Sequence, residues 1–255
     1  ELSLTVNTQP ALVCASIAMY RFYLQEGGRK PDLLAGHSLG EYSALVAAGA
    51  LDYGALQLVR YRAEQMQAAV PVGEGTMAAI LGLSDDQVKT VCLNALQMAL
   101  SKRNFNTPGQ VVIAGTVAAV QEAMEKSLAA GAKRAIKLNF PVRSFFFDET
   151  AALAMEEKLK TVDLQKPFLP VLHNVDVQIH EEPDAIRDVL AAQVASGSGA
   201  DTVRKMEEAG VMEIYEVGPG AALSGMVKRI TKGITAKALN SLAALEEAAA
   251  ANQEK

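Results

Sequence analysis

The sequence predicts an α/β fold in which a parallel sheet is interrupted by a smaller, ferredoxin-like subdomain. In residues 1–72 and again in residues 139–255, short apolar segments alternate with helical patterns, as in parallel sheets whose strands are joined by helices. Between them, residues 73–138 read as strand, helix, strand, strand, helix and strand, the order of a ferredoxin-like unit. We therefore expect residues 1–72 and 139–255 to form one core and residues 73–138 to form an insert.

The first core segment begins with a helical pattern and leads into a short apolar strand. Thr8 is expected to cap the first helix and Pro10 to lie in its first turn, because these residue types are favoured there. Asp52 is expected to cap a later helix in the same way. The predicted elements are a helix over 11–25, a strand over 33–35, a helix from 38 to about 49 and a helix from 52 to 66.

The insert and the second core segment continue the alternation of strands and helices. For the insert, the predicted elements are strands over 76–83, near 103–105, over 110–115 and over 132–138, with helices over 85–100 and 118–130. For the second core segment, they are helices over 151–159, 184–194, 202–209, around 223–227 and from 242 onward, with strands over 170–175 and 212–217. Residues 196–200 are serine, glycine and alanine, and are expected to form a flexible loop.

Composition narrows the class of protein. The formal net charge of −5, from 24 basic and 29 acidic residues, argues against a nucleic-acid binder. The sequence shows no apolar run long enough to span a membrane and no signal peptide. Cys14 and Cys92 lie in separate apolar helical patterns, so we expect buried thiols rather than a disulfide, and a location in the cytoplasm or an organelle matrix. Because the chain starts at Glu1 without an initiator Met, we expect that an N-terminal portion is missing.

A nucleophile is expected at Ser38. The run Gly36-His37-Ser38-Leu39-Gly40 has the Gly-x-Ser-x-Gly pattern of a nucleophile elbow, a strained turn between a strand and a helix. Such a turn needs small neighbours because strand and helix come close together. The N–H of Leu39 would then point at the oxyanion of an acyl intermediate, at a helix N-terminus that favours negative charge. The alternative, a structural turn, is disfavoured because the pattern lies between an aliphatic strand and a helix.

Several segments together resemble the malonyl-CoA:acyl carrier protein transacylases of fatty-acid and polyketide synthesis. They occur in the family's order and extend over nearly the whole chain, so the combination is far more specific than the serine pattern alone. The matching segments are Thr8–Leu12, Gly36–Leu45, Tyr61–Arg62, Met66–Gln67, Asn104–Gly115, Asn174–Asp176 and Tyr215–Gly220.

This resemblance implies an α/β-hydrolase-like core with a ferredoxin-like insert, and ping-pong acyl transfer through a serine ester. Ser38 would attack the malonyl thioester, release CoA and hold the malonyl group until the pantetheine thiol of acyl carrier protein collects it. The N–H of Leu39 would be one oxyanion donor. Arg62 matches the arginine that binds the malonyl carboxylate through two charge-assisted hydrogen bonds. Gln193 matches a glutamine whose backbone carbonyl orients the catalytic histidine. The family uses no cofactor and no metal, and usually works as a monomer.

The local pattern alone leaves other interpretations open. From helical spacing alone, Arg62 is better explained as a surface residue of an amphipathic helix, and Gln193 as an ordinary polar residue at a helix end. Only the resemblance favours their functional roles. His37 precedes the nucleophile in a tight turn, so it is expected to point away and to be structural. His173 and His180 are expected to be structural or solvated histidines.

Two parts of the family pattern are absent. The first is an N-terminal Gly-Gln-Gly segment, whose glutamine helps to form the oxyanion hole, and a truncated N-terminus would explain this gap. The second is the general-base histidine, which the family places in the region of Ser144-Phe145-Phe146-Phe147. Phenylalanine cannot accept a proton and Asp148 would be a much weaker base, so we expect a loss of roughly 10²–10⁴ in rate. A degenerate or regulatory homologue, a variant engineered to lack the base and a sequence error at these positions all remain open.

The leading hypothesis is a malonyl-CoA:acyl carrier protein transacylase. An α/β serine hydrolase is less consistent, because it has no need for a cation such as Arg62 at its acyl pocket. A non-catalytic module that binds acyl-CoA or carrier protein stays open. Because acyl carrier protein is acidic, a local basic patch is expected, with Lys228, Arg229 and Lys232 as candidates, although a solvated helix face would explain them equally well.

Overall fold

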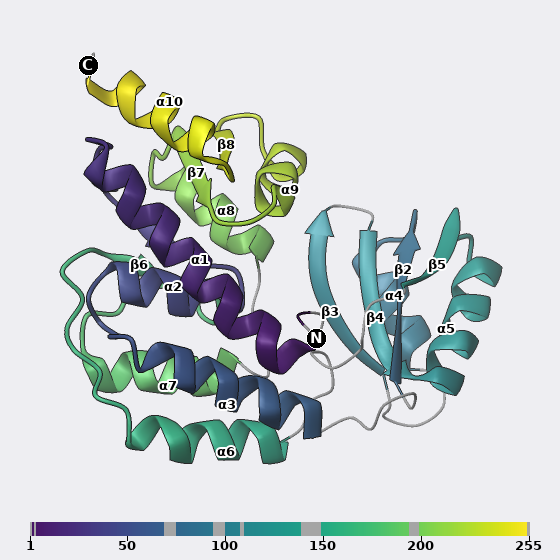
Figure 1. Cartoon of the computed structure of the whole chain (residues 1–255). Coiled ribbons are helices and arrows are strands. Elements are labelled where there is room, and N and C mark those ends of the chain that lie inside the picture. The colour runs from purple at the N-terminus through teal and green to yellow at the C-terminus, as the bar shows by residue number, and fades with distance from the viewer. Residues whose placement is uncertain are drawn as a thin grey trace.

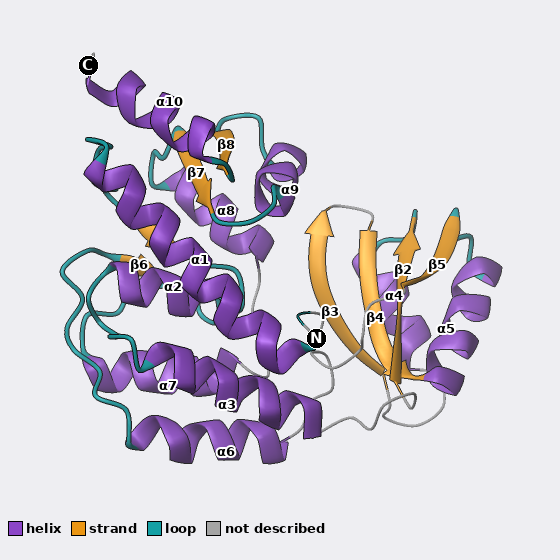
Figure 2. Cartoon of the chain, viewed as in Figure 1, coloured by secondary structure: helices purple, strands orange, loops and turns teal. Residues whose placement is uncertain are grey.

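The computed structural model describes residues 2, 4–68, 75–93, 100–107, 110–138, 149–193 and 199–253. These residues form two parts that lie side by side in Figure 1. The larger part is mainly helical and holds two small parallel sheets, whereas the smaller part is an antiparallel sheet with two helices (Figure 2). The predicted α/β class is therefore confirmed.

The elements follow the predicted order closely. Those of the larger part are α1 (Thr5–Gln25), β1 (Leu34–Ala35), α2 (Gly40–Ala47), α3 (Ala55–Ala68), α6 (Glu149–Lys160), β6 (Val171–Leu172), α7 (Pro183–Gln193), α8 (Gly199–Glu208), β7 (Glu213–Val217), α9 (Ala222–Ile230), β8 (Thr235–Leu239) and α10 (Leu242–Gln253). Those of the smaller part are β2 (Gly75–Leu81), α4 (Asp85–Leu93), β3 (Leu100–Thr107), β4 (Gln110–Thr116), α5 (Val117–Ala129) and β5 (Arg134–Leu138).

Parallel pairing brings distant segments of the larger part together. Strand β1 pairs with β6, with Leu34 opposite Val171 and Ala35 opposite Leu172, and β7 pairs with β8. In the described residues these are two separate two-stranded sheets rather than one continuous sheet. Because β1 and β6 are parallel, the residues that follow each strand lie at the same edge. This edge carries the serine turn.

The smaller part is an antiparallel sheet with the strand order β3-β4-β2-β5. Helix α5 packs on β2, β4 and β5, and the core between helices and sheet is aliphatic, from Ile80 and Ile113 in the strands to Val88 and Val120 in the helices. The edge strand β3 contacts α8 and α9 of the larger part. The two parts are thus joined along this strand.

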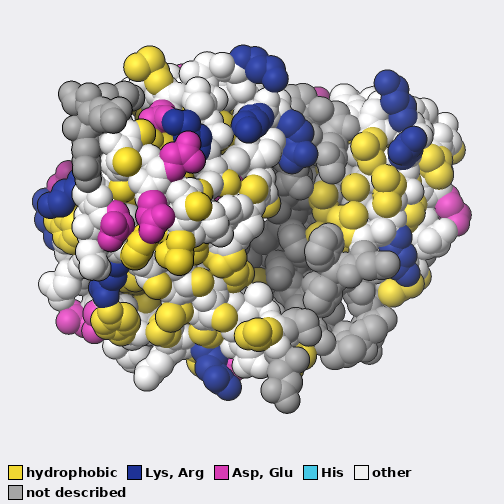
Figure 3. All heavy atoms as spheres, turned by 45° about the horizontal axis from the view of Figure 1, so that its top comes forward, with side chains coloured by type: hydrophobic (Ala, Val, Ile, Leu, Met, Phe, Trp, Pro, Cys, Tyr) yellow, Lys and Arg dark blue, Asp and Glu magenta, His cyan; other side chains and the backbone are white. Residues whose placement is uncertain are grey.

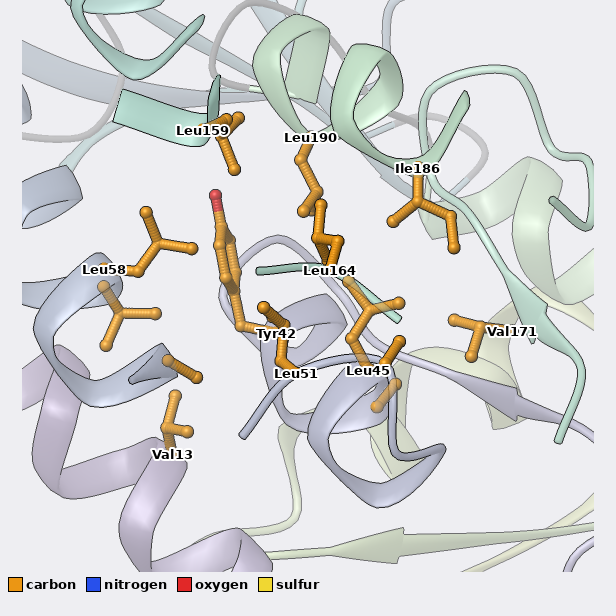
Figure 4. Packing of buried hydrophobic residues seen from close by; sticks show 14 of the residues in the cluster. Val13, Tyr42, Leu45, Leu51, Leu58, Leu159, Leu164, Val171, Ile186 and Leu190 are labelled. Atoms are coloured by element: carbon orange, nitrogen blue, oxygen red, sulfur yellow. The ribbon is translucent and has the colours of Figure 1, made fainter. Parts of the chain in front are cut away.

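The core of the larger part is built around Tyr42 and aliphatic side chains. Figure 4 shows the Tyr42 ring among Leu58, Leu159 and Leu164, with the hydroxyl group directed into the cluster. All of these side chains are at least 95% buried. Helices α1, α2, α3, α6 and α7 contribute to this cluster, so burial of their apolar faces fixes how they pack around the serine turn.

The surface carries both signs of charge. On the face shown in Figure 3, Lys and Arg side chains are interspersed with Asp and Glu over the larger part, and hydrophobic side chains gather over the smaller part on the right. The net negative charge is therefore not concentrated on this face. No helix within the described ranges is both long and apolar enough to cross a membrane.

Four details differ from the sequence predictions. Helix α1 begins at Thr5, not after Thr8, because Leu4 acts as its N-cap and its carbonyl accepts the first backbone bonds; Pro10 therefore lies inside the helix. Leu100 starts strand β3 instead of ending a helix, since cross-strand pairing with β4 outweighs the local helical pattern. Gly199 and Ala200 begin helix α8 rather than a loop. Strand β8 was not predicted, because only its pairing with β7 identifies it.

Neither cysteine forms a disulfide, as expected, but Cys14 is exposed and Cys92 is half-buried. The predicted burial of Cys14 is wrong because it lies on the outward face of α1, whereas Val13 and Ile17 face the core.

Candidate active site

The turn between β1 and α2 has the strained geometry expected of a nucleophile elbow. Ser38 has φ = 52°, a left-handed conformation that costs free energy for a residue with a side chain. Gly36 is packed against the start of α2, and a Cβ atom there would lie 1.9 Å from the carbonyl carbon of Gly40. Only glycine at position 36 allows this close approach. The sequence pattern therefore predicts the local conformation correctly.

The backbone next to Ser38 presents a free donor. Leu39 is the N-cap of α2, with helical φ and ψ, and its N–H has no acceptor among the described residues. The first N–H groups of a helix are unpaired within the helix and carry the positive end of its dipole. This N–H can therefore bind a developing oxyanion.

Arg62 lies beside the serine side chain. Its Nη2 donates a hydrogen bond of 3.0 Å to Ser38 Oγ, and its Nη1 donates one of 2.8 Å to Gln9 Oε1. The Arg62 side chain comes from α3, where it is 3% exposed, and its Nε has no partner among the described residues. A buried guanidinium with a spare donor next to Ser38 is suited to binding an anionic group.

Gln193, at the end of α7, connects the arginine to the serine turn. Its Oε1 accepts a bond of 3.5 Å from Arg62 Nη2, and its Nε2 donates one of 3.0 Å to the backbone carbonyl of Ser38. The same Nε2 donates a bond of 2.7 Å to Glu41 Oε2. The structure thus brings Ser38, Arg62 and Gln193 together, with the glutamine side chain making these contacts.

Glu41 is a completely buried carboxylate in the first turn of α2. Its Oε1 lies 2.6 Å from Nδ1 of His173, and its Oε2 accepts bonds of 3.3 Å from the backbone N–H of Asn174 and 2.8 Å from Asn174 Nδ2. Asn174 Nδ2 also donates to the carbonyl of Gly36. A buried charge is stable only when it is well hydrogen-bonded, and these donors meet that need.

Two groups near the turn have shifted pKa values. Burial raises the pKa of Tyr42 to about 12; the nearby Arg62 guanidinium, whose Cζ lies 5.6 Å from the ring centre, opposes the shift. Burial lowers the pKa of His37, which packs against Gly199. Both groups are therefore held in their neutral forms at neutral pH.

The three histidines take the structural positions expected of them. His37 makes no hydrogen bond to Ser38 among the described residues. His173 is fully buried and paired with Glu41, and His180 is paired with Asp176 at 2.6 Å on the surface. The region 144–147, where the resemblance implies a general base, lies outside the described residues.

Sequence reasoning gave no role to Glu41, His173, Asn174 or Gln9. In the sequence, Glu41 is visible only as part of the serine motif. An acidic residue in the first turn of a helix is ordinary, because it is stabilised by the positive end of the helix dipole. One signal was available: His173 and Asn174 follow a strand, and the carboxyl ends of parallel strands meet at one edge. In the described part of the chain, no group of three or more His, Cys, Asp or Glu side chains could hold a metal ion.

Comparison with known proteins defines the family. A model of the acyl transferase domain matches residues 1–243. The malonyl CoA-acyl carrier protein transacylase of Escherichia coli is 46% identical over 252 residues, which are 97% of this chain and 82% of that protein. The chain belongs to the malonyl-CoA:acyl carrier protein transacylase family. Its Bacillus subtilis member is 43% identical over 243 residues, or 91% of this chain and 74% of that protein.

Solved structures of transacylases from this family share the fold. A malonyl-transacylase in complex with a type II PKS acyl-carrier protein has a TM-score of 0.92 and 42% identity, covering 99% of this chain and 83% of that chain. An acyl-carrier-protein S-malonyltransferase from Burkholderia pseudomallei has a TM-score of 0.88 and 43% identity, covering 98% of this chain and 83% of that chain. The transacylase fold therefore extends over nearly all of this chain.

Proposed function

We propose that this chain transfers a malonyl group from malonyl-CoA to the phosphopantetheine thiol of acyl carrier protein. The observation that carries the proposal is the hydrogen bond of 3.0 Å between Arg62 Nη2 and Ser38 Oγ in a buried site. It supports the proposal because a guanidinium, a group suited to binding a carboxylate, lies directly beside an elbow serine. The names of the relatives supply the two substrates. A simple serine hydrolase would have no use for a buried arginine at this position.

The proposed reaction has two half-steps that share one acyl-enzyme. Ser38 Oγ forms a bond to the malonyl carbonyl carbon, the C–S bond to CoA breaks, and the serine proton ends on the departing sulfur. The pantetheine thiol then attacks the ester carbonyl carbon, and its proton returns to Ser38 as the ester bond breaks. The N–H of Leu39 stabilises the oxyanion in both half-steps. Arg62 holds the malonyl carboxylate throughout.

The proton transfers in this mechanism lack the general base that the family uses. The sequence contains no histidine in residues 139–148, and Phe145, Phe146 and Phe147 cannot carry a proton. We therefore expect acyl transfer roughly 10²–10⁴ slower than with a general base in place. This absence also supports a second candidate function, a module that binds malonyl-CoA or carrier protein without turnover. The role first expected for Gln193, orienting a histidine through its carbonyl, depends on the same region.

A docking surface for acyl carrier protein is proposed at the end of α9. Lys228, Arg229 and Lys232 are all exposed there and form no ion pair among the described residues. By contrast, Arg204 and Lys205 on the neighbouring helix α8 are each paired with an acid. Unpaired positive charges would attract an acidic carrier protein.

We also propose the finer architecture that the resemblance implies. Residues 1–72 and 139–255 would form an α/β-hydrolase-like core, supported by the strand–turn–helix around Ser38 and by parallel pairing of β1 with β6. Residues 73–138 would form a ferredoxin-like insert, supported by the order β3-β4-β2-β5. We further propose a monomer in the cytoplasm or an organelle matrix, without nucleic-acid or membrane partners, consistent with the net charge of −5.

The direct test is to trap the acyl-enzyme. Incubation with labelled malonyl-CoA should leave a malonyl adduct on Ser38, detected by intact mass and peptide mapping, and Ser38→Ala should abolish it. Arg62→Ala should slow malonyl labelling by about 10²-fold, because a buried charge-assisted contact is lost, and should improve labelling by acetyl-CoA. A wild-type chain that binds malonyl-CoA but never forms an adduct would support the binding module.

The missing base can be tested by restoring it. Four variants, Ser144→His, Phe145→His, Phe146→His and Phe147→His, should include one that labels roughly 10²–10⁴ faster than the wild type. Phe140→His, outside the expected window, is the matched control. Equal rates in all five variants and the wild type would contradict the assigned position of the base.

A further inference from the structure

A buried carboxylate beneath the nucleophile turn has no role in the proposed chemistry. Glu41 lies three residues after Ser38, is fully buried, and has hydrogen-bond partners on both oxygens. We call Glu41, His173, Asn174 and Gln193 the Glu41 network. All four side chains are at least 95% buried, so their hydrogen bonds form away from water and are costly to leave unmade.

The Glu41 network connects three segments that are distant in sequence. Glu41 comes from the start of α2, His173 and Asn174 from the segment directly after β6, and Gln193 from the end of α7. Their contacts join residues 132, 133 and 152 positions apart. The carboxylate is the shared acceptor, so no two of the three segments can move apart without breaking a bond to it.

The network also holds the strained turn on both sides of the nucleophile. Asn174 Nδ2 donates to the carbonyl of Gly36, before the serine, and Gln193 Nε2 donates to the carbonyl of Ser38 itself at 3.0 Å. A residue with φ = 52° is retained only where its surroundings over-determine it. Both of these donors are in turn fixed by Glu41.

We propose that Glu41 is a positioning residue that holds Ser38 in its reactive conformation, acting through the amides of Asn174 and Gln193. Gln193 is suited to this because its amide nitrogen donates both to the carbonyl of Ser38 and to the glutamate. The expected effect on the rate of Ser38 acylation rests on the proposed function, but the expected effect on the conformation of the turn does not.

The substitution that tests this is Glu41→Gln, which preserves size but replaces one acceptor oxygen by a donor. Either one of the N–H groups that face Glu41 would then lose its acceptor, or His173 would have to carry its proton on Nε2, which has no partner among the described residues. We expect malonyl labelling of Ser38 to slow by about 10²-fold, the cost of a misplacement on the order of 1 Å. In a Ser38→Ala background, the affinity for malonyl-CoA should change less than about 3-fold, since the direct donor Arg62 is intact. Glu41→Asp, which keeps the charge, should recover part of the rate.

Hydrogen exchange provides a readout that does not need turnover. Glu41→Gln should raise amide exchange in peptides covering residues 34–45, whereas peptides covering 213–230 should be unchanged. The matched control is Glu216→Gln, which removes another carboxylate that accepts N–H donors, those of Leu223 and Ser224 at 3.0 and 2.6 Å. This control should raise exchange only near α9 and leave the labelling rate unchanged.

Three results would overturn the inference. One is wild-type labelling together with wild-type exchange over residues 34–45 in Glu41→Gln. Another is a uniform rise of exchange across the chain, with Glu41→Asp as slow as Glu41→Gln, which would make Glu41 a general structural residue. The third is a loss of malonyl-CoA affinity equal to the loss of rate. If the wild type itself forms no adduct, the proposed function fails, and the exchange experiment alone decides the role of Glu41.

Discussion

The turns from β1 to α2 and from β7 to α9 both connect a strand to a helix through glycines, and they differ in what the glycines do. In the turn from β1 to α2, Gly36 provides space against Gly40, and the left-handed position is occupied by Ser38 with φ = 52°. In the turn from β7 to α9, the positive φ values of 141° and 99° belong to Gly218 and Gly220. The second turn uses glycine at its left-handed positions, whereas the first has a serine there and so carries a side chain in a strained conformation.

The acidic residues next to the two turns, Glu216 and Glu41, also differ in which groups their carboxylates bind. Glu216 uses its carboxylate locally, to accept the N–H groups of Leu223 and Ser224 in the first turn of α9. Glu41 makes no such local cap and instead binds residues from the segment directly after β6 and from the end of α7. The unstrained turn is stabilised from within, and the strained one by segments distant in sequence.

The largest expected effect tests the space-making role of glycine in the first turn. Gly36→Ala should destabilise the protein by at least about 4 kcal/mol, because its Cβ would overlap backbone atoms of Gly40 that cannot move independently. Gly40→Ala is the control, since a Cβ there meets nothing within 4 Å, and it should change the free energy of unfolding by no more than about 1 kcal/mol. Urea unfolding measures both. Similar costs for the two variants would contradict the close packing of this turn.

A second, smaller effect is a pH dependence of stability that comes from Tyr42, next to the first turn. Tyr42 is buried directly behind the nucleophile turn, and its pKa is raised to about 12, above the ordinary value near 10. The folded state therefore keeps the phenol proton longer than the unfolded state does. This contribution to stability is fully present below pH 10 and is lost as the pH rises towards 12, by about 2 kcal/mol.

Tyr42→Phe removes this dependence and leaves the other alkaline titrations in place. The free energy of unfolding of the wild type minus that of the variant should therefore be constant from pH 7 to about 9.5 and should fall above pH 10. Chemical unfolding at several pH values measures it. A constant difference up to pH 12 would show that the phenol is not buried as described.

The smallest effect tests the conformational role of glycine in the second turn. Gly220→Ala should cost about 1–2 kcal/mol, because the position has φ = 99° although a Cβ would meet no atom within 4 Å. Gly225→Ala, in α9 and equally open, should instead be neutral or stabilise by up to about 1 kcal/mol. Thermal unfolding of the pair separates backbone strain from packing. Equal effects would mean that the positive φ carries no cost.

Much of the fold was predictable because its signals are local. The elements around Ser38, the helix that carries Arg62 and the succession of strands and helices along the smaller part follow from residue spacing and turn residues. The errors occur where a tertiary contact overrides the local pattern, as at Leu100, whose pairing with β4 makes it a strand residue. Strand β8 was missed because its short segment becomes a strand only by pairing with β7.

The candidate site likewise has a part that follows from local sequence and a part that depends on tertiary contacts. By itself, the sequence determined the serine turn, because the pattern from Gly36 to Gly40 is contiguous and its conformation depends on the sizes of near neighbours. Only the tertiary structure decided that Glu41 is buried and that His173 and Gln193 bind it. Those contacts join residues 132 and 152 positions apart, and whether a carboxylate lies in water or in a shell of N–H donors depends on how the elements pack.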